Sequence, residues 1–306
     1  MTTLAEYLEA CRAEIDAALD AALPRPPDCP AVVADAMRYS VTAGGKRLRP
    51  VLCLASAEAV GGRRADAMPA ACAIELIHTY SLIHDDLPAM DNDTMRRGRP
   101  TLHVVAGEGM AILAGDGLLT EAFALLARHP QTSDPLLAER TLRVIAVVAA
   151  AAGAAGMVGG QALDLACVTP DPRGRLAPPL DAEGLRAMHA KKTGALIRAS
   201  AVSGAILGGG TERDINAIET AATELGLAFQ IIDDVLDVDG ASADLGKTAG
   251  KDAAAGKPTY PALYGVTRSR QMAAECLERA GAALAAVNLA DSRLLQIGRW
   301  IVERGN

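Results

Sequence analysis

The sequence predicts an all-α protein, a helical bundle around a deep central cavity. Apolar residues recur at helical spacing through most of the chain, and nowhere do several residues alternate in the manner of a strand with Val, Thr and aromatic residues. Half of the 306 residues are hydrophobic, which is enough to build a large core. Neither a repeat period nor a domain boundary is visible, so we expect a single domain over residues 1–306.

The composition indicates which partners the protein binds and in which cellular compartment it works. The formal charge of -7, with no balancing basic stripe, argues against a nucleic-acid-binding protein but leaves room for phosphorylated small molecules at local basic clusters. The six cysteines are scattered without a Cys-x-x-Cys pair, and no secretory leader is visible. We therefore expect a cytoplasmic chain with reduced cysteines and no disulfides.

Four helices are expected in the first part of the chain. The first is amphipathic, with Leu4 and Cys11 on its apolar face, and a proline-rich connector follows it. Gly44 and Gly45 end the second helix, because glycine readily adopts the left-handed cap, and Pro50 starts the third. The expected spans are residues 1–23, 31–42, 50–60 and 68–86.

The fourth of these helices ends in three carboxylates, Asp85, Asp86 and Asp91, on an otherwise apolar segment. Carboxylates placed so closely repel one another and lose hydration on folding unless a positive charge compensates them. A magnesium ion held by carboxylate oxygens, water and substrate phosphate would supply that charge. An ideal helix would turn Asp91 away from Asp85, but Pro88 disfavours helix there and lets the chain fold back.

Basic residues near this cluster have two interpretations. Arg96 and Arg97, in an exposed polar loop expected over residues 92–100, are ordinary surface charges or, beside a metal site, clamps for phosphate oxygens. The basic run at residues 46–50 would, on its own, be solvated charge after a helix end. His78, two turns before the acidic cluster, is either a core histidine or directed toward the same end of the bundle.

The second part of the chain is also helical. Residues 144–163 carry no charge but are rich in Ala and Gly, so we expect a helix buried through small residues rather than a membrane span. Lys191 and Lys192 would face solvent by default, although the apolar residues after them leave an inward lysine open. The expected helices cover residues 110–128, 136–155 and 159–166, a segment capped by Asp181 that carries residues 191–194, then 212–239 and the chain from 259.

A second acidic cluster lies in the helix expected over residues 212–239. Asp233 and Asp237 are four residues apart and share a helical face, and Gln230 precedes them by one turn. The composition of residues 244–252, which follow, resembles that of a mobile basic loop. Two acidic clusters, each accompanied by basic residues, predict facing carboxylate walls that hold magnesium around a diphosphate.

These motifs resemble those of the polyprenyl diphosphate synthase family, the trans-isoprenyl diphosphate synthases, and most of all its bacterial farnesyl diphosphate synthases. The resemblance covers nearly the whole chain and keeps the order of the motifs. The matching segments are the basic run 44–50, the acidic motif 85–91, Lys192-Thr193, Phe229-Gln230, the acidic motif 233–237 and Lys247. Two acidic clusters with basic motifs in register are highly specific, whereas one alone would be weak evidence.

The resemblance implies a role for each matched residue. Asp85, Asp91 and Asp233 would bind three magnesium ions, with Asp86 and Asp237 as further candidate ligands and manganese as a substitute metal. The allylic diphosphate would contact Arg96, Lys192, Lys247 and Lys257. The diphosphate of isopentenyl diphosphate would contact Lys46, Arg49, His78 and Arg97. Thr193 and Gln230 would face the reacting carbons and, with Lys192, Asp85 and Asp233, form the catalytic set.

One departure from the family pattern is visible, because Asn92 and Thr94 stand where the family often has acidic residues. This departure leaves the predicted ligands in place and affects only the expected affinity for the metal. Tyr80 and Ser81, just before the first acidic motif, are the expected determinants of product length, Tyr80 being otherwise a core tyrosine.

The function implied is head-to-tail condensation of isopentenyl diphosphate with dimethylallyl or geranyl diphosphate, with release of diphosphate. Farnesyl diphosphate is the expected product and geranylgeranyl diphosphate the alternative. A class I terpene cyclase needs no second-substrate site, so Lys46, Arg49 and His78 argue against it. Two intact acidic clusters argue against a noncatalytic partner subunit. An isoprenoid-synthase-like bundle, assembled as a homodimer, is expected.

Overall fold

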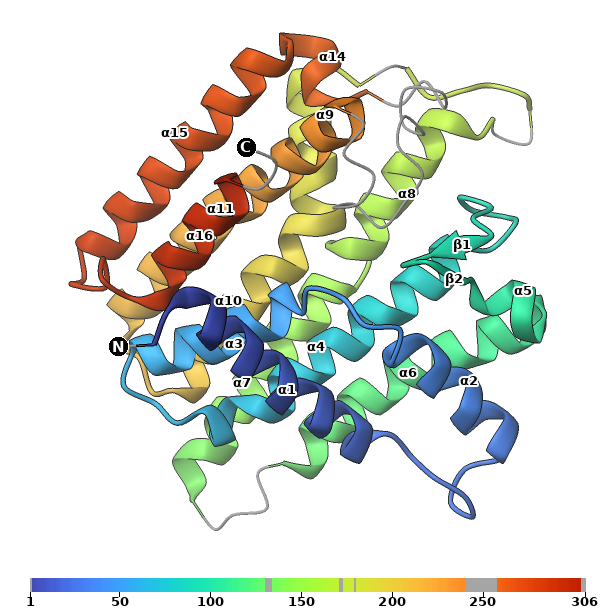
Figure 1. Ribbon diagram of the computed structural model, residues 1–306, viewed down its shortest axis with the longest axis horizontal. Helices are drawn as coiled ribbons and strands as arrows, with labels where there is room; N and C mark the ends of the chain where they lie inside the picture. Colours follow the sequence, from blue (N-terminus) through green and yellow to red (C-terminus); the bar gives the residue numbers. More distant parts are fainter. Residues whose placement is uncertain (1, 130–133, 171–172, 179, 240–257, 304–306) are drawn as a thin grey trace. The chain divides into compact units, whose positions relative to one another are not determined.

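The computed structural model describes residues 2–129, 134–170, 173–178, 180–239 and 258–303 (Figure 1). Helices make up nearly all of the regular structure in those residues, so the predicted all-α class is confirmed. The chain divides into two compact units, one of Met1–Ala146 with Ser203–Gly210 and one of Val147–Val202 with Thr211–Asn306. The single domain expected over residues 1–306 stays a prediction.

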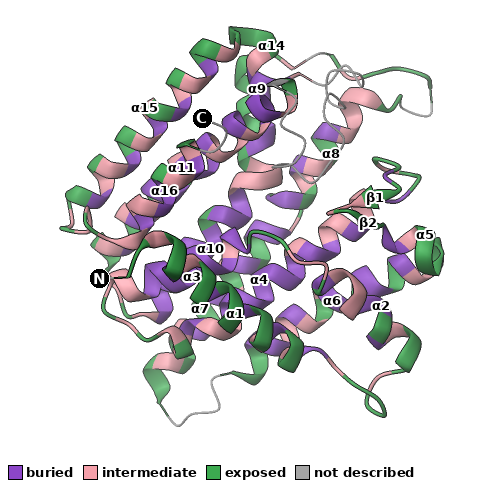
Figure 2. Ribbon diagram, in the orientation of Figure 1, coloured by how far each residue is buried: buried purple, intermediate pink, exposed green. Residues whose placement is uncertain are grey.

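The first unit is organised around α4, whose side chains are buried along most of its length (Figure 2). Helices α3 and α6 pack on α4, and α1 and α2 contact it as well. The elements of this unit are α1 (Leu4–Ala22), α2 (Ala31–Val41), α3 (Leu48–Ala59), α4 (Arg64–Asp85), β1 (Met95–Arg96), β2 (Arg99–Pro100), α5 (Leu102–Ala106), α6 (Glu108–Arg128), the first part of α7 (Pro135–Ala152) and the end of α10 (Ala195–Leu207).

Two helix starts in this unit show how the local sequence acts. Thr3 caps α1 in a capping box, in which its hydroxyl accepts from the backbone N–H of Glu6 while the Glu6 carboxylate accepts from that of Thr3. The prediction that Pro50 starts the third helix was wrong, because α3 begins at Leu48 after Arg47 in the left-handed region. Pro50 lies in the first turn, where its missing N–H removes no helical hydrogen bond.

Residues 92–100 are not the wholly exposed loop that the sequence predicted. Strands β1 and β2 pair antiparallel, with Met95 opposite Pro100. Asp93 is buried, and its backbone carbonyl accepts a hydrogen bond from the Thr101 hydroxyl at 2.7 Å. This small hairpin therefore has a fixed shape directly after the first acidic motif.

The second unit is organised around α11, which has the bounds predicted from the sequence. Helices α15 and α16 pack along α11, and α14, α9 and η1 contact it too. The elements of this unit are the end of α7, α8 (Met157–Val168), α9 (Ala182–His189), the π-helix η1 (Ala190–Gly194), the first part of α10 (Ala195–Leu207), α11 (Glu212–Asp239), α14 (Tyr260–Tyr264), α15 (Val266–Ala285) and α16 (Arg293–Glu303).

The uncharged stretch at residues 144–163 is only partly the buried helix that was expected. Helix α7 ends at Ala152, and α8 begins after a four-residue break. Val144 and Val148 are fully buried, whereas Val158 is 48% exposed. By length and composition alone, Glu108–Arg128 and Pro135–Val168 could each cross a membrane, so the expected absence of a membrane span stays a prediction.

Candidate active site

The first acidic motif folds back on itself as predicted. Helix α4 ends at Asp85, and the backbone N–H of Asp91 donates to the Asp85 carbonyl at 2.8 Å. A turn around Pro88, in which the Met90 N–H donates to the Leu87 carbonyl, makes this approach. Asp85 is half-buried and Asp91 exposed, so one turn presents two carboxylates that a bound ion could reach.

Asp86 has a different environment from its neighbour. Asp86 is 4% exposed. Two nitrogens of the Arg96 guanidinium contact its Oδ1, Nε at 2.8 Å and Nη2 at 2.6 Å. Burial raises the pKa of Asp86, and the positive charge of Arg96 opposes that rise. Arg96, predicted to hold the allylic diphosphate, is thus positioned by Asp86, and a metal-binding role for Asp86 stays a prediction.

Four residues predicted to bind the second diphosphate belong to the first unit. Lys46 is exposed, and Arg49 and Arg97 are half-buried. His78 has lost enough solvation that its pKa falls well below 6.5, and the charges of Arg49 and Arg97 lower it further. A neutral imidazole together with two arginines leaves these residues able to attract an anion and to hydrogen-bond it.

The second acidic motif lies on α11. Asp233 and Asp237 are half-buried on one face of the continuous helix, as predicted. Asp234 points elsewhere, because its carboxylate accepts from the Tyr260 backbone N–H at 3.0 Å and from the Gln230 amide at 3.1 Å. Gln230 therefore braces Asp234, and its predicted place beside the reacting carbons stays a prediction.

Lys192 and Thr193 lie on a π-helical turn that sequence reasoning did not predict. Such turns are rare and frequently occur at functional sites, because they displace side chains from the regular helical positions. The Lys192 ammonium pairs with Asp164, a buried carboxylate of α8. Sequence reasoning missed Asp164, although a single acidic residue in an uncharged helix was a signal that it needs a cationic partner.

The side chains of the two motifs suit magnesium. Among the described residues, no three His, Cys, Asp or Glu side chains gather into a closed metal site. Each motif instead offers two hard carboxylate donors and leaves positions for water and phosphate oxygens, which is how magnesium is usually held. The predicted meeting of the two motifs around one diphosphate stays a prediction. Lys247 and Lys257 lie outside the described residues.

The predicted length-determining residues lie beside Asp85. Tyr80 is 7% exposed, and its ring meets the His84 ring edge-on at 5.6 Å. Burial raises the pKa of Tyr80, and the charge of Asp85 raises it further. Ser81 is half-buried, and its hydroxyl donates to the His78 carbonyl at 2.9 Å.

The chain matches known proteins over nearly its whole length. A polyprenyl synthetase family model matches residues 30–290. The geranylgeranyl diphosphate synthase of Cyanophora paradoxa is 45% identical over 303 residues, which cover 99% of this chain and 97% of that protein. The heterodimeric geranylgeranyl pyrophosphate synthase large subunit 1 of Arabidopsis thaliana is 48% identical over 85% of this chain and 68% of its own length. The apo FPP/GFPP synthase of Zymomonas mobilis superposes with a TM-score of 0.84, at 37% identity and over 98% of both chains.

Proposed function

We propose that this chain, which belongs to the polyprenyl synthetase family and is therefore a trans-prenyltransferase, has a specific reaction. It condenses isopentenyl diphosphate with allylic diphosphates. The observation that carries the proposal is the pair of accessible carboxylates, Asp85 and Asp91, on one turn beside a basic cluster. An allylic carbon–oxygen bond ionises only where the leaving diphosphate is stabilised, and acidic residues serve that purpose only by holding cations.

Each group of side chains has a distinct part in this reaction. Magnesium, when bound by Asp85, Asp91 and Asp233, would neutralise the departing diphosphate. Arg96, on the first unit, would hold oxygens of the departing diphosphate as its bond to carbon breaks, and Lys192, on the second unit, is proposed for the same role. The double bond of isopentenyl diphosphate then attacks the allylic cation, and the new carbon–carbon bond is followed by loss of a proton to the released diphosphate. Residues around the cation exclude water, which would otherwise quench it.

The basic cluster of the first unit would orient the second substrate. Arg49 and Arg97 supply charge for its diphosphate, and His78 supplies a neutral hydrogen-bonding group, because its pKa lies well below 6.5. A neutral imidazole avoids adding charge to an already crowded cationic site. A terpene cyclase would have no use for this cluster, which therefore favours a two-substrate condensation.

The product length is proposed as twenty carbons. The curated relatives named above are geranylgeranyl synthases, and this favours the alternative over the farnesyl product expected first. Farnesyl diphosphate remains the second candidate, because the buried ring of Tyr80 lies on α4 shortly before Asp85, where a growing chain would begin its path into the protein.

The purified chain tests the proposal when it is incubated with isopentenyl diphosphate, dimethylallyl diphosphate and magnesium. We expect a prenyl diphosphate whose mass corresponds to twenty carbons, and no product once EDTA has removed the metal. A fifteen-carbon diphosphate would select the second candidate. Hydrocarbon products would indicate a cyclase, and no product from a folded chain with intact magnesium would overturn the proposal in favour of a noncatalytic subunit.

Assembly and location complete the proposal. Exposed apolar side chains on α6 and α7, Ile112, Leu113 and Leu142, are 44%, 55% and 69% accessible in the single chain. Large apolar side chains left exposed on these two helices favour an interface with a second chain, so a homodimer is proposed. A cytoplasmic location is proposed from the scattered cysteines, and the absence of nucleic-acid partners from the acidic composition.

A further inference from the structure

We propose that Arg47 is a positioning residue for the second-substrate diphosphate, which it never touches itself. Arg47 lies between Lys46 and Arg49, two residues expected to bind that diphosphate. The proposal rests on the proposed function and adds to it a residue that neither the motifs nor the comparisons assign. Its basis is that Arg47 turns inward while its neighbour Lys46 is exposed.

The Arg47 side chain is buried and fully engaged. It is 3% exposed, and each of its three nitrogens has a partner. Nε donates to Asp16 Oδ1 at 2.8 Å, Nη1 to Glu75 Oε1 at 2.9 Å and Nη2 to the Val41 carbonyl at 2.7 Å. These partners lie on α1, α4 and α2, so one guanidinium joins three helices at the loop between α2 and α3.

The backbone of this loop explains why so strong an anchor is required. Gly44, Gly45 and Arg47 all have positive φ, of 80°, 133° and 49°. For Arg47, which has a Cβ, this left-handed conformation is disfavoured and persists only where other contacts hold it. The buried guanidinium supplies those contacts, and the loop thereby keeps the shape that sends Lys46 outward and starts α3 at Leu48.

A second arginine of the expected site packs against the same loop. The Arg97 Nη1 donates to the Gly44 carbonyl, and a Cβ built on Gly45 would lie 2.7 Å from the Arg97 Cζ. Loop conformation and Arg97 position are therefore coupled. A shift of the loop would move Lys46 and Arg97 together, which is the signature expected of a positioning element rather than of a general stabiliser.

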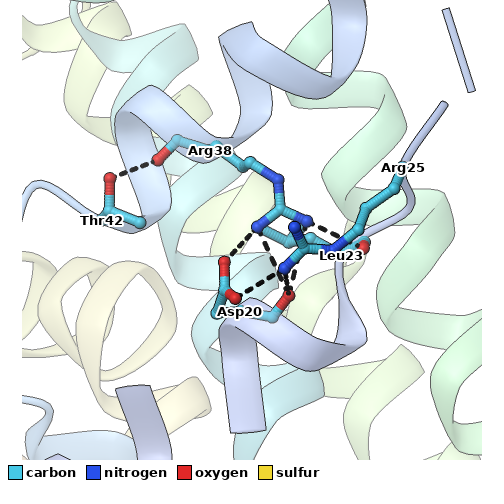
Figure 3. Close-up of polar contacts among 5 residues, drawn as sticks. All are labelled: Asp20, Leu23, Arg25, Arg38 and Thr42. Carbon is cyan, nitrogen blue, oxygen red and sulfur yellow. Dashed lines mark hydrogen bonds and ion pairs between the residues drawn. The ribbon is translucent and has the colours of Figure 1, made fainter. Parts of the chain in front are cut away.

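Helix α1 holds both ends of the loop with carboxylates one turn apart. Asp16 forms an ion pair with Arg47 at the end of the loop. Asp20 forms an ion pair with Arg38 near the end of α2 (Figure 3). The Thr42 hydroxyl, at the start of the loop, donates to the Arg38 carbonyl at 2.7 Å. These contacts fix the two ends of the loop. The backbone conformation between them depends on Arg47.

The buried partner of Arg47 links the loop to His78. Glu75 is 2% exposed and lies one turn before His78 on α4. A buried ion pair contributes little net stability compared with apolar residues, but it fixes one arrangement, because any other leaves a charge unpaired. The Arg47–Glu75 pair therefore sets the register between the helix that carries His78 and the loop that carries Lys46.

The test compares Arg47→Lys with a matched control, Arg64→Lys. Arg64 also ties α1 into the unit, through ion pairs with Glu14 and Glu58, but it lies in no expected binding segment. We expect Arg47→Lys to raise the KM for isopentenyl diphosphate about tenfold or more, with the KM for the allylic substrate changed less than about twofold. Arg64→Lys should leave both KM values unchanged. Equal rises in both KM values, or a fall in kcat alone, would overturn the proposal.

Two further measurements keep the result interpretable. If Arg47→Lys does not fold, Asp16→Asn removes only one of the three contacts, at a carboxylate that is 53% exposed, and should produce a smaller rise in the same KM. If the wild-type chain forms no prenyl product, the proposed function fails first. Calorimetric binding of inorganic diphosphate then decides the role of Arg47, with weaker binding to Arg47→Lys than to Arg64→Lys expected and equal binding contradicting it.

Discussion

At the scale of residues, the second aspartate of each acidic motif holds the segment that follows the motif. Asp86 is buried and grips Arg96 in the hairpin, while Asp234 is buried and accepts from the backbone N–H of Tyr260. In both motifs the aspartate before it, Asp85 or Asp233, is half-buried. In each adjacent pair, the second carboxylate holds the segment that follows, and the first is the one predicted to bind the metal.

Tyr80→Ala should lengthen the product. The buried ring lies on α4 shortly before Asp85, and its removal opens space along the path that a growing prenyl chain would take. We expect the product masses to shift to longer prenyl diphosphates by five-carbon steps. The matched variant Tyr80→Phe keeps the ring and should leave the masses unchanged. Identical products from wild type and Tyr80→Ala would reject Tyr80 as a wall of the cavity.

His189 should make the stability of the fold fall in mild acid. Burial lowers its pKa from 6.5 to about 4, with the charge of Lys192 adding to the shift and that of Asp164 opposing it. The pKa of His189 is lower in the folded chain than in the unfolded chain. The stability that the neutral imidazole contributes is therefore complete above pH 6.5 and is lost as the pH falls toward 4. Between pH 7.5 and pH 5 the loss amounts to about 2 kcal/mol.

Urea unfolding at the two pH values measures this loss. His189→Gln should reduce the pH dependence of the free energy of unfolding by that amount, since glutamine does not titrate. His129→Gln, at an exposed histidine, should retain the wild-type dependence. If the two variants lose equal stability on acidification, burial of His189 is not the cause.

At the scale of elements, close backbone contact positions the π-helical turn. Gly160 of α8 packs against η1 so closely that a Cβ there would clash with the Lys192 backbone nitrogen. Gly226 of α11 approaches η1 from its own helix, with a built Cβ 3.4 Å from the Cα of Gly194. The π-turn, and Lys192 with it, is held between helices by residues without side chains.

Gly160→Ala should therefore affect both stability and catalysis. The added methyl meets backbone that cannot move alone, so we expect a loss of about 1–3 kcal/mol of unfolding free energy. Displacement of Lys192 should also lower kcat/KM, by about tenfold to a hundredfold. Gly109→Ala is the control, because a Cβ on Gly109 meets nothing within 4 Å. A Gly160→Ala protein as stable and active as that control would contradict this account.

At the scale of the whole molecule, the exposed apolar side chains of α6 and α7 are proposed to form the dimer interface. The wild-type chain should elute from size exclusion with a light-scattering mass of about 63 kDa, twice 31.5 kDa. Leu142→Glu should shift the mass to that of one chain, because a charge buried in an apolar interface is costly. Leu176→Glu, at another exposed leucine, should not. A wild-type mass of 31.5 kDa would end the homodimer proposal.

The sequence by itself determined the all-α class, most of the helices and the local geometry of the motifs. The bounds of α11, the cap of Asp181 and the fold-back of Asp91 onto Asp85 follow from interactions within a few residues, which local sequence specifies completely. Only the tertiary structure decided which neighbouring charge turns inward. Arg47 meets Glu75 across 28 residues and Lys192 meets Asp164 across another 28. In the basic run Lys46 and Arg47 look alike, because the free energy that separates an exposed cation from a buried one comes from partners that only folding brings together.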